Sequence, residues 1–286
     1  MSAPDAAWPL GTVTVLGAHI LDVLGRPVET IPPGQGSVRL REIRATAAGT
    51  AAGTGVDLAK LGARVLAAGA IGDDLLGDVV VAAMARHGVD TAGLVRKNEA
   101  QTSATILTGG DLADIAGAAK ASGVLVAVDV LHPGRPQDLE RLAPLLAVTD
   151  WFMPNGDQLL ALTGRTEPAD AIKDVLALGT AAVAVTCGAD GCLVAWPGAG
   201  APVKLPALEV EVVDTTGCGD GFTAGLLAGL LAGATALDAA WLGLACGALV
   251  ATGLGSDAGI ENLGQVLDFL SGKQPAVAGR IKEHMS

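Results

Sequence analysis

The chain has 286 residues, of which 50% are apolar and only 2% aromatic, and it contains no tyrosine. This length suits one large domain, whose core must be built mainly from alanine, valine and leucine. There are 18 lysines and arginines against 30 acidic residues, a formal net charge of −12, and no basic cluster. This balance excludes a partner as acidic as nucleic acid, although backbone amides in a local pocket can still bind small anions.

The sequence also argues against secretion, zinc binding and membrane insertion. Cys187, Cys192, Cys218 and Cys246 form no Cys-x-x-Cys pair and have no nearby histidine, so we expect buried, reduced thiols in a cytoplasmic protein. The N-terminus lacks the basic and apolar regions of a secretory signal. In the apolar stretch 221–254, glycine recurs at every fourth position from 221 to 233. The part of this stretch before Asp238 is too short to span a bilayer. We expect two core helices here, the first packing its glycines against a sheet.

The first third of the chain alternates between β-rich and helical segments. Apolar runs predict strands over 12–23 and 65–72, and helical patterns follow each of them, over 53–62 and 77–88. Two further strands, at 37–46 and 102–107, mix apolar with polar residues, which indicates one face in water. Because these strands do not suit a buried core, we expect a small separate sheet that acts as a lid, formed by residues 30–47 and 98–108.

From residue 111 onward, helices and strands alternate regularly. Strands are expected at 124–131, 150–155, 181–188 and 191–198. Helices are expected at 111–123, 136–149, 156–164, 167–179, twice within 221–254, and at 260–272. Such alternation predicts an α/β fold with a mostly parallel sheet covered by helices on both faces.

One segment, Asp-Thr-Thr-Gly-Cys-Gly-Asp at 214–220, combines features of an anion site. Glycines allow consecutive amides to point into one concavity, and a helix that starts there adds the positive end of its dipole. Beside a bound phosphoryl group, Asp220 can take a proton from an attacking hydroxyl. The alternative is a glycine-rich turn with Asp220 capping its helix, and spacing alone gives the two interpretations similar weight.

This segment closely resembles the second signature of the PfkB, or ribokinase-like, sugar kinases, usually D-T-x-G-A-G-D, with Cys218 in place of the alanine. Four other segments resemble the family in the same order along the chain: "VLGAHILDV" at 15–23, 48–78, "PNGDQLLALTG" at 154–164 and "VAVTCGADGCLV" at 183–194. The resemblance implies a single ribokinase-like kinase domain over 1–286, a three-layer α/β/α sandwich with a small β lid. It also implies ATP-dependent phosphorylation of a hydroxyl of a sugar, sugar acid or nucleoside.

The resemblance further implies roles for the matching residues. Asp220 would be the catalytic base, and the amides of Gly217, Cys218 and Gly219 the anion hole. The implied acceptor contacts are Asp22, Gly49 and Gly53, and the implied nucleotide contacts are Asn155, Thr186, Gly188, Gly191 and Gly219. Positions that bind an activating monovalent cation in the family are Asp214, Thr216, Val250, Gly253 and Gly255, although Asp214 could instead only tie down the turn. The expected cofactors are ATP and Mg²⁺, with K⁺ at the cation loop, and lid strands that pair in this family suggest a homodimer.

Several residues depart from the family pattern. Gly53 stands where an asparagine usually bonds the acceptor, which removes the basis for expecting ribose-type recognition. Asp57 replaces a small apolar residue, and we favour a solvent-facing side chain over one that supplies polarity to the site. Gln158 replaces a glutamate that helps to organise magnesium, so we expect weaker magnesium affinity. These changes leave open a catalytically weak ligand-binding or regulatory protein, although the retained Asp220 argues against it.

The interval between the expected strands 102–107 and 124–131 is shorter than in the family by several dozen residues. Either the lid is reduced, or the sequence skips a segment around 108–111. The second alternative is favoured, because loss of a central strand would expose a parallel sheet. Two other features have plain alternatives: His19 could touch a ligand or be an ordinary loop histidine, and Arg44 could reach an anionic acceptor or lie on a solvated strand face.

Overall fold

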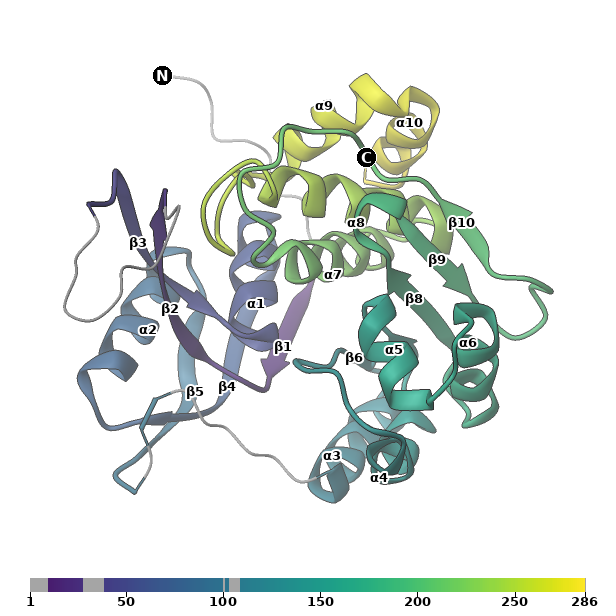
Figure 1. Cartoon of the computed structure of the whole chain (residues 1–286), viewed down its shortest axis with the longest axis horizontal. Coiled ribbons are helices and arrows are strands. Elements are labelled where there is room, and N and C mark those ends of the chain that lie inside the picture. The colour runs from purple at the N-terminus through teal and green to yellow at the C-terminus, as the bar shows by residue number, and fades with distance from the viewer. Residues whose placement is uncertain (1–9, 28–38, 100, 103–108, 286) are drawn as a thin grey trace. The chain divides into compact units, whose positions relative to one another are not determined.

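The computed structural model describes residues 10–27, 39–99, 101–102 and 109–285. By its contacts the chain divides into two compact units (Figure 1). The first unit consists of Met1–Thr105, Val210–Gly221 and Leu249–Gln265. The second unit consists of Ile106–Glu209, Phe222–Ala248 and Val266–Ser286.

The first unit is built on a parallel sheet with the strand order β1-β4-β5. Its strands are β1 (Thr12–Leu16), β4 (Arg64–Gly72) and β5 (Asp90–Lys97), and its helices are α1 (Thr50–Lys60) and α2 (Leu75–Arg86). Both helices contact this sheet and bury apolar side chains such as Val56 and Met84. Strand β5 was not expected, since its glycine and three charged residues hide its strand character.

A second, two-stranded antiparallel sheet in the first unit pairs β2 (Ile20–Arg26) with β3 (Glu42–Ala48). The run 12–23, expected to be one strand, therefore separates into β1 and β2, and Asp22 lies opposite Thr46 in the smaller sheet. A separate sheet near 37–46 is thus present. The other segment predicted to form it, 102–107, lies almost wholly outside the described residues, as do residues 30–38, and the function of this sheet as a lid stays a prediction.

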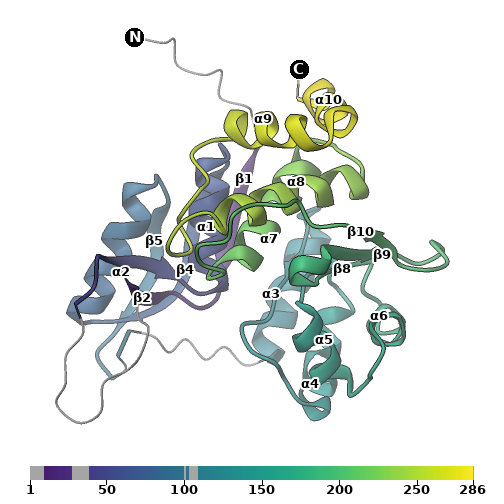
Figure 2. The same ribbon diagram turned by 45° about the horizontal axis from the view of Figure 1, so that its top comes forward.

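The second unit contains a five-stranded sheet with the order β10-β9-β8-β7-β6, parallel from β6 to β8 and antiparallel beyond. Figure 2 labels β8, β9 and β10 of this sheet. Its strands are β6 (Ala127–Val128), β7 (Trp151–Phe152), β8 (Ala182–Thr186), β9 (Cys192–Ala195) and β10 (Val203–Leu205). The flanking helices are α3 (Gly109–Ala121), α4 (Pro136–Leu146), α5 (Gly156–Thr163) and α6 (Pro168–Ala177). Phe152, Leu159 and Ile172 belong to one buried apolar cluster that joins this sheet to its helices.

The C-terminal helices are α7 (Cys218–Leu231), α8 (Ala236–Val250), α9 (Leu263–Lys273) and α10 (Pro275–His284). Two glycines of the repeat, Gly225 and Gly229, face α8 and not a sheet as expected: a methyl group on Gly225 would lie 2.6 Å from Leu242 O, and one on Gly229 would lie 2.8 Å from Ala239 Cα. Small residues let the two backbones approach closely. Among the helices of the described ranges, none has the length and apolar character needed to cross a bilayer.

Candidate active site

The segment 214–220 forms a turn in the first unit that leads into α7. The helix begins at Cys218, and Asp220 lies in its first turn. Gly217 has φ +80°, a conformation that side chains disfavour. Cys218 N donates a long hydrogen bond of 3.3 Å to Thr215 O, whereas the amides of Gly217 and Gly219 have no acceptor in the described part of the chain. Two backbone donors thus remain unpaired at the positive end of a helix dipole.

The loop that follows α8 supports this turn. A methyl group on Gly217 would overlap Ser256 Cα, so the loop requires glycine here for space as well as for backbone angle. Val213 N donates to Ala251 O at 2.8 Å, and Gly255 N donates to Asp214 Oδ2 at 3.0 Å. The loop and the turn are therefore fixed to each other by packing and by hydrogen bonds within one unit.

Asp214 ties down the turn, one of the two roles considered for it. Its Oδ1 accepts hydrogen bonds from Thr216 N (3.0 Å) and Thr216 Oγ1 (2.9 Å), in addition to the bond from Gly255 at Oδ2. Burial alone would raise the pKa of Asp214, but these hydrogen bonds outweigh it and lower the pKa. At the other proposed cation ligands, Val250 O and Gly255 O each accept one backbone bond and keep a second lone pair that could face an ion.

Three residues expected to face the acceptor lie near this turn. Burial raises the pKa of Asp22, and the negative charge of the nearby Asp214 carboxylate raises it further. Gly49 is the N-cap of α1 and accepts the first bond of that helix, from Gly53 N at 2.9 Å. A methyl group on Gly53 would lie 2.5 Å from Asp220 Oδ2. The carboxylate of Asp220 therefore rests in space that any side chain at position 53 would take.

Two polar side chains are buried where the sequence suggested otherwise. Asp57 is 0% exposed, so the favoured solvent-facing position is wrong. Its oxygens accept no hydrogen bond from the described residues, and Lys60 Nζ lies 3.5 Å from Oδ1. Burial accordingly raises the pKa of Asp57 to about 7, against the opposing effect of Lys60. His19 is also buried; its Nδ1 lies 2.9 Å from Gly17 O, and burial lowers its pKa.

Of the five residues expected to line the nucleotide, Gly219 lies in the first unit and the other four lie in the second unit. Asn155 and Thr186 form an isolated parallel bridge, and Thr186 N donates to Pro154 O at 3.1 Å. Gly188 and Gly191 belong to the tight turn between β8 and β9, closed by Cys187 N donating to Gly191 O at 2.8 Å. A methyl group on Gly191 would overlap Leu205 O in β10, so this glycine is required by packing.

Gln158 has a structural role that its family counterpart, a glutamate, could fill only in part. Its Oε1 accepts from Asn155 N (2.7 Å), and Asn155 Oδ1 accepts from Gln158 N (2.8 Å), which makes a capping box at the start of α5. Gln158 Nε2 also donates to Val130 O at 2.7 Å. Since a carboxylate has no proton to donate, glutamate could not make this last bond.

Sequence reasoning did not single out Asp129, although a carboxylate inside the apolar run 124–131 was a visible signal. Asp129 follows β6 directly, and its Oδ1 accepts from Val130 N at 2.7 Å. Burial raises the pKa of Asp129 to about 7, opposed by this bond and by one from the Thr223 side chain. By its exposed surface Asp129 is half-buried. A carboxylate with a raised pKa at the end of a parallel strand is a functional-site candidate.

Comparison with solved structures shows the fold. Arabidopsis thaliana ribokinase, in complex with ribose and ATP, superimposes with a TM-score of 0.76 at 22% identity, over 91% of this chain and 98% of that one. Aminoimidazole riboside kinase from Salmonella enterica gives 0.74 at 24% identity, over 91% and 100%. The predicted ribokinase-like three-layer α/β/α fold with its mostly parallel sheet is thereby confirmed.

Sequence comparison shows the family. Ribokinase from Haemophilus influenzae is 29% identical over 317 aligned positions, which cover 91% of this chain and 98% of that protein. This alignment is longer than the chain itself, so it places gaps in this chain, in keeping with the shortened interval. Aminoimidazole riboside kinase from Salmonella typhimurium is 33% identical over half of the chain and 46% of its own length. The model of the pfkB family carbohydrate kinases matches residues 11–114 and 110–263. The chain therefore belongs to the PfkB family of carbohydrate kinases.

Proposed function

We propose that this chain transfers the γ-phosphate of ATP to a hydroxyl group of a sugar, sugar acid or nucleoside, with Asp220 as the base. The observation that carries the proposal is a pair of amides, on Gly217 and Gly219, that find no acceptor among the described residues and lie at the start of the helix that bears Asp220. A methyl group on Gly219 would meet nothing within 4 Å, so protein packing does not explain this glycine. A phosphoryl group that must approach the amides does explain it.

In this proposal, Asp220 accepts the hydroxyl proton while the acceptor oxygen forms its bond to the γ-phosphorus and the bond to the β-phosphate oxygen breaks. The amides of Gly217, Cys218 and Gly219 stabilise the negative charge on the transferred group, and the α7 dipole adds to their effect. These donors are fixed before the reaction, because the loop after α8 holds the turn in place. Positioning and preorganised donors supply most of the catalysis in phosphoryl transfer.

We further propose that ATP binds with Mg²⁺ along Asn155, Thr186, Gly188 and Gly191. A solved E. coli ribokinase II that shares this fold contains ATP and Mg²⁺, which supports this choice. Gln158 is committed to the start of α5, so its side chain is not available to organise magnesium as a glutamate would be. Magnesium would then be held mainly by the phosphates and by water.

The loop of Asp214, Thr216, Val250, Gly253 and Gly255 is proposed to bind K⁺. Asp214 keeps its negative charge at neutral pH, since its pKa is lowered, and the two carbonyls described above keep lone pairs. The loop is also closed by its own hydrogen bonds. We therefore expect K⁺ to raise the rate of turnover without being required for folding. Activity assays in K⁺ and in Na⁺, with thermal unfolding measured in parallel, test both statements.

A homodimer through the β2–β3 sheet is also proposed. Val23 is 64% exposed and Ile43 is 66% exposed, and both belong to this small sheet. Exposed apolar patches of this kind mark association surfaces. None of the four cysteines, which all lie in the described ranges, forms a disulfide, although Cys187 and Cys218 are only half-buried, and reduced thiols suit the cytoplasm proposed as the location. Sedimentation of the wild type and of Ile43→Lys tests the dimer, which the substitution should weaken.

The acceptor is to be identified by a phosphorylation screen. Sugars, sugar acids and nucleosides are each incubated with protein, ATP and Mg²⁺, and acceptor-dependent ADP release is measured. Because Gly53 cannot offer the usual asparagine contact, we expect sugar acids or nucleosides to be better acceptors than free ribose. Absence of turnover with every acceptor would favour the alternative of a ligand-binding or regulatory protein.

A further inference from the structure

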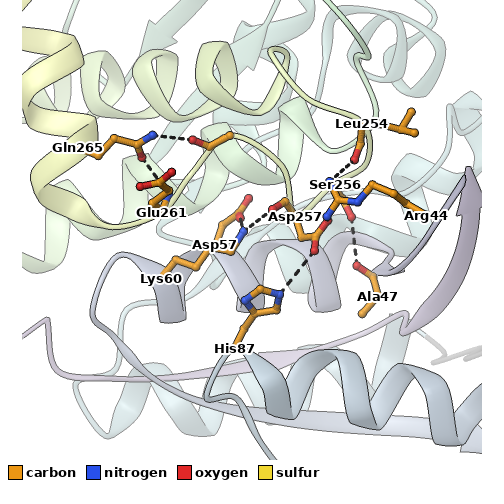
Figure 3. Close-up of polar contacts among 11 residues, drawn as sticks. Arg44, Ala47, Asp57, Lys60, His87, Leu254, Ser256, Asp257, Glu261 and Gln265 are labelled. Atoms are coloured by element: carbon orange, nitrogen blue, oxygen red, sulfur yellow. Dashed lines mark hydrogen bonds and ion pairs between the residues drawn. The ribbon is translucent and has the colours of Figure 1, made fainter. Parts of the chain in front are cut away.

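A cavity of about 270 Å³ lies in the first unit and is lined in part by the loop that follows α8. Its polar lining comes from β3, from the ends of α1 and α2, and from the loop, and consists of Arg44, Lys60, Arg86, His87, Asp257 and Glu261. Figure 3 shows Arg44, Lys60 and His87 directed toward Asp257 from three different elements. No residue assigned to the acceptor, the nucleotide or the anion hole lines this cavity.

Asp257 is the centre of the polar contacts in this cavity. Its Oδ1 accepts from Arg44 Nη2 at 2.9 Å, and its Oδ2 lies 3.5 Å from His87 Nε2. Its backbone oxygen accepts from Lys60 Nζ at 2.5 Å. Arg44 Nη1 donates to Leu254 O at 2.7 Å as well. The cations are thus held in fixed positions around the loop (Figure 3).

The cavity carries more positive than negative charge, in a chain with a formal charge of −12. Among the lining residues, Arg44, Lys60 and Arg86 are permanent cations, against the acids Asp257 and Glu261. The buried Asp57, 3.5 Å from Lys60 and with a pKa of about 7, offsets part of the remaining positive charge at neutral pH. His87 does not add to the count at neutral pH, because burial, followed by the nearby Lys60, lowers its pKa. Arg86 has no ion-pair partner within the described ranges. Its guanidinium is therefore available to an anion from solution.

Donors also remain on the paired cations. A lysine ammonium has three N–H donors and an arginine guanidinium five. Lys60 uses one in its hydrogen bond to Asp257 O, and Arg44 uses two in the bonds described. The volume is below that of most small-molecule pockets, which are about 300–1,000 Å³, and it is room for about nine waters at about 30 Å³ each. This suits a phosphate group with its water or with a small organic substituent, and is too small for a nucleotide.

We propose that this cavity binds a small phosphate-bearing anion, held by Arg86 together with Lys60 and Arg44. A bound anion interacts with the same cations that contact Asp257 and the carbonyl oxygen of Leu254, both in the loop that carries Gly255 and Ser256. Ser256 packs on Gly217, and Ser256 Oγ donates to Ala47 O at 3.1 Å.

Binding is tested by calorimetric titration of the full chain with inorganic phosphate, and separately with glycerol phosphate, at low ionic strength. Arg86→Gln removes an exposed guanidinium that has no structural partner, and Arg64→Gln, which alters an exposed arginine at the start of β4, is the matched control. We expect Arg86→Gln to weaken phosphate binding about tenfold, the loss of one charged hydrogen bond, and Arg64→Gln to leave it unchanged. Glycerol phosphate binding as tightly as phosphate would identify a phosphate monoester as the natural class.

Repeating the titration with saturating ATP distinguishes this cavity from the anion hole. Phosphate bound at Arg86 stays bound, whereas phosphate bound at Gly217–Gly219 is displaced. No saturable binding at millimolar phosphate, displacement by ATP, or equal binding by Arg86→Gln and wild type would each overturn the proposal. Kinase activity is not needed for any of these results, so failure of the proposed function leaves this test intact.

Discussion

The buried carboxylate of Asp57 should make the stability of this protein depend on pH. Asp57 is 0% exposed, and burial raises its pKa from 3.8 to about 7 despite Lys60 at 3.5 Å. In the unfolded chain the Asp57 carboxyl ionises near pH 3.8. The stability that the neutral carboxyl contributes in acid is therefore lost as the pH rises from about 4 to about 7, and it does not return at higher pH. At about 1.36 kcal/mol per pKa unit, the loss is about 4 kcal/mol.

Asp57→Asn keeps the shape of the side chain and cannot ionise. The free energy of unfolding of each protein is measured by urea denaturation, followed by circular dichroism, at about pH 4.5 and about pH 8. The unfolding free energy of the variant minus that of the wild type should be about 3 kcal/mol larger at about pH 8 than at about pH 4.5. Asp129 titrates in both proteins, so its contribution cancels.

Asp268→Asn is the matched control, because the side chain of Asp268 is 81% exposed. Its difference from wild type shows the effect of replacing an exposed aspartate, against which the effect of Asp57→Asn is compared. If the difference between wild type and Asp57→Asn changes with pH no more than that of this control, Asp57 is not held in a neutral state by burial, and the reasoning is wrong. A larger benefit of Asp57→Asn in acid than in alkali would contradict the sign of the argument.

Four other substitutions test the turn, the neighbouring Gly53 and, separately, the capping residue Gln158. Gly217→Ala should lower stability in thermal unfolding by about 1–3 kcal/mol, because φ is +80° and the added methyl group would overlap the loop after α8. In Gly219→Ala the added methyl group would meet no atom of the described residues within 4 Å, so this variant should unfold like wild type yet lose kinase activity. Equal stabilities of these two variants would contradict the packing argument. Gln158→Glu should lower stability by about 1–3 kcal/mol because a backbone carbonyl loses its donor, and an unchanged unfolding midpoint would refute this. Gly53→Ala should displace the carboxylate of Asp220 and lower kcat about a hundredfold without loss of stability, and wild-type kcat would show that this contact is unimportant.

Local patterns predicted most helices and the turn of the site, because both depend on residues close in sequence. Glycine spacing located the start of α7, and apolar periodicity located α1, α2, α5 and α6. Strands were predicted less well where their pairing with other strands determines where they begin and end. The run 12–23 looks continuous in sequence, yet its second half pairs with β3 in another sheet. Strands β5 and β10 and helix α10 were missed for the same reason, since packing outweighs their weak local signals.

Contacts between residues distant in sequence were beyond local reasoning. The burial of Asp57 depends on what covers that face of α1, and the sequence offers only its polarity, which favours solvent. Arg44 looked like part of a wet strand face, but it binds Asp257 across more than two hundred residues of chain. The glycine repeat of α7 correctly indicated a close packing face, and only the structure identifies α8 as its partner.

The central claim, that Asp220 takes the proton of an acceptor hydroxyl, is tested most directly by one comparison. With the acceptor found in the screen, phosphoryl transfer is measured for wild type and for Asp220→Asn, with ATP affinity determined in parallel by titration. The claim predicts that the substitution lowers kcat by at least about a hundredfold and leaves ATP binding unchanged. Turnover by Asp220→Asn at the rate of the wild type would contradict it.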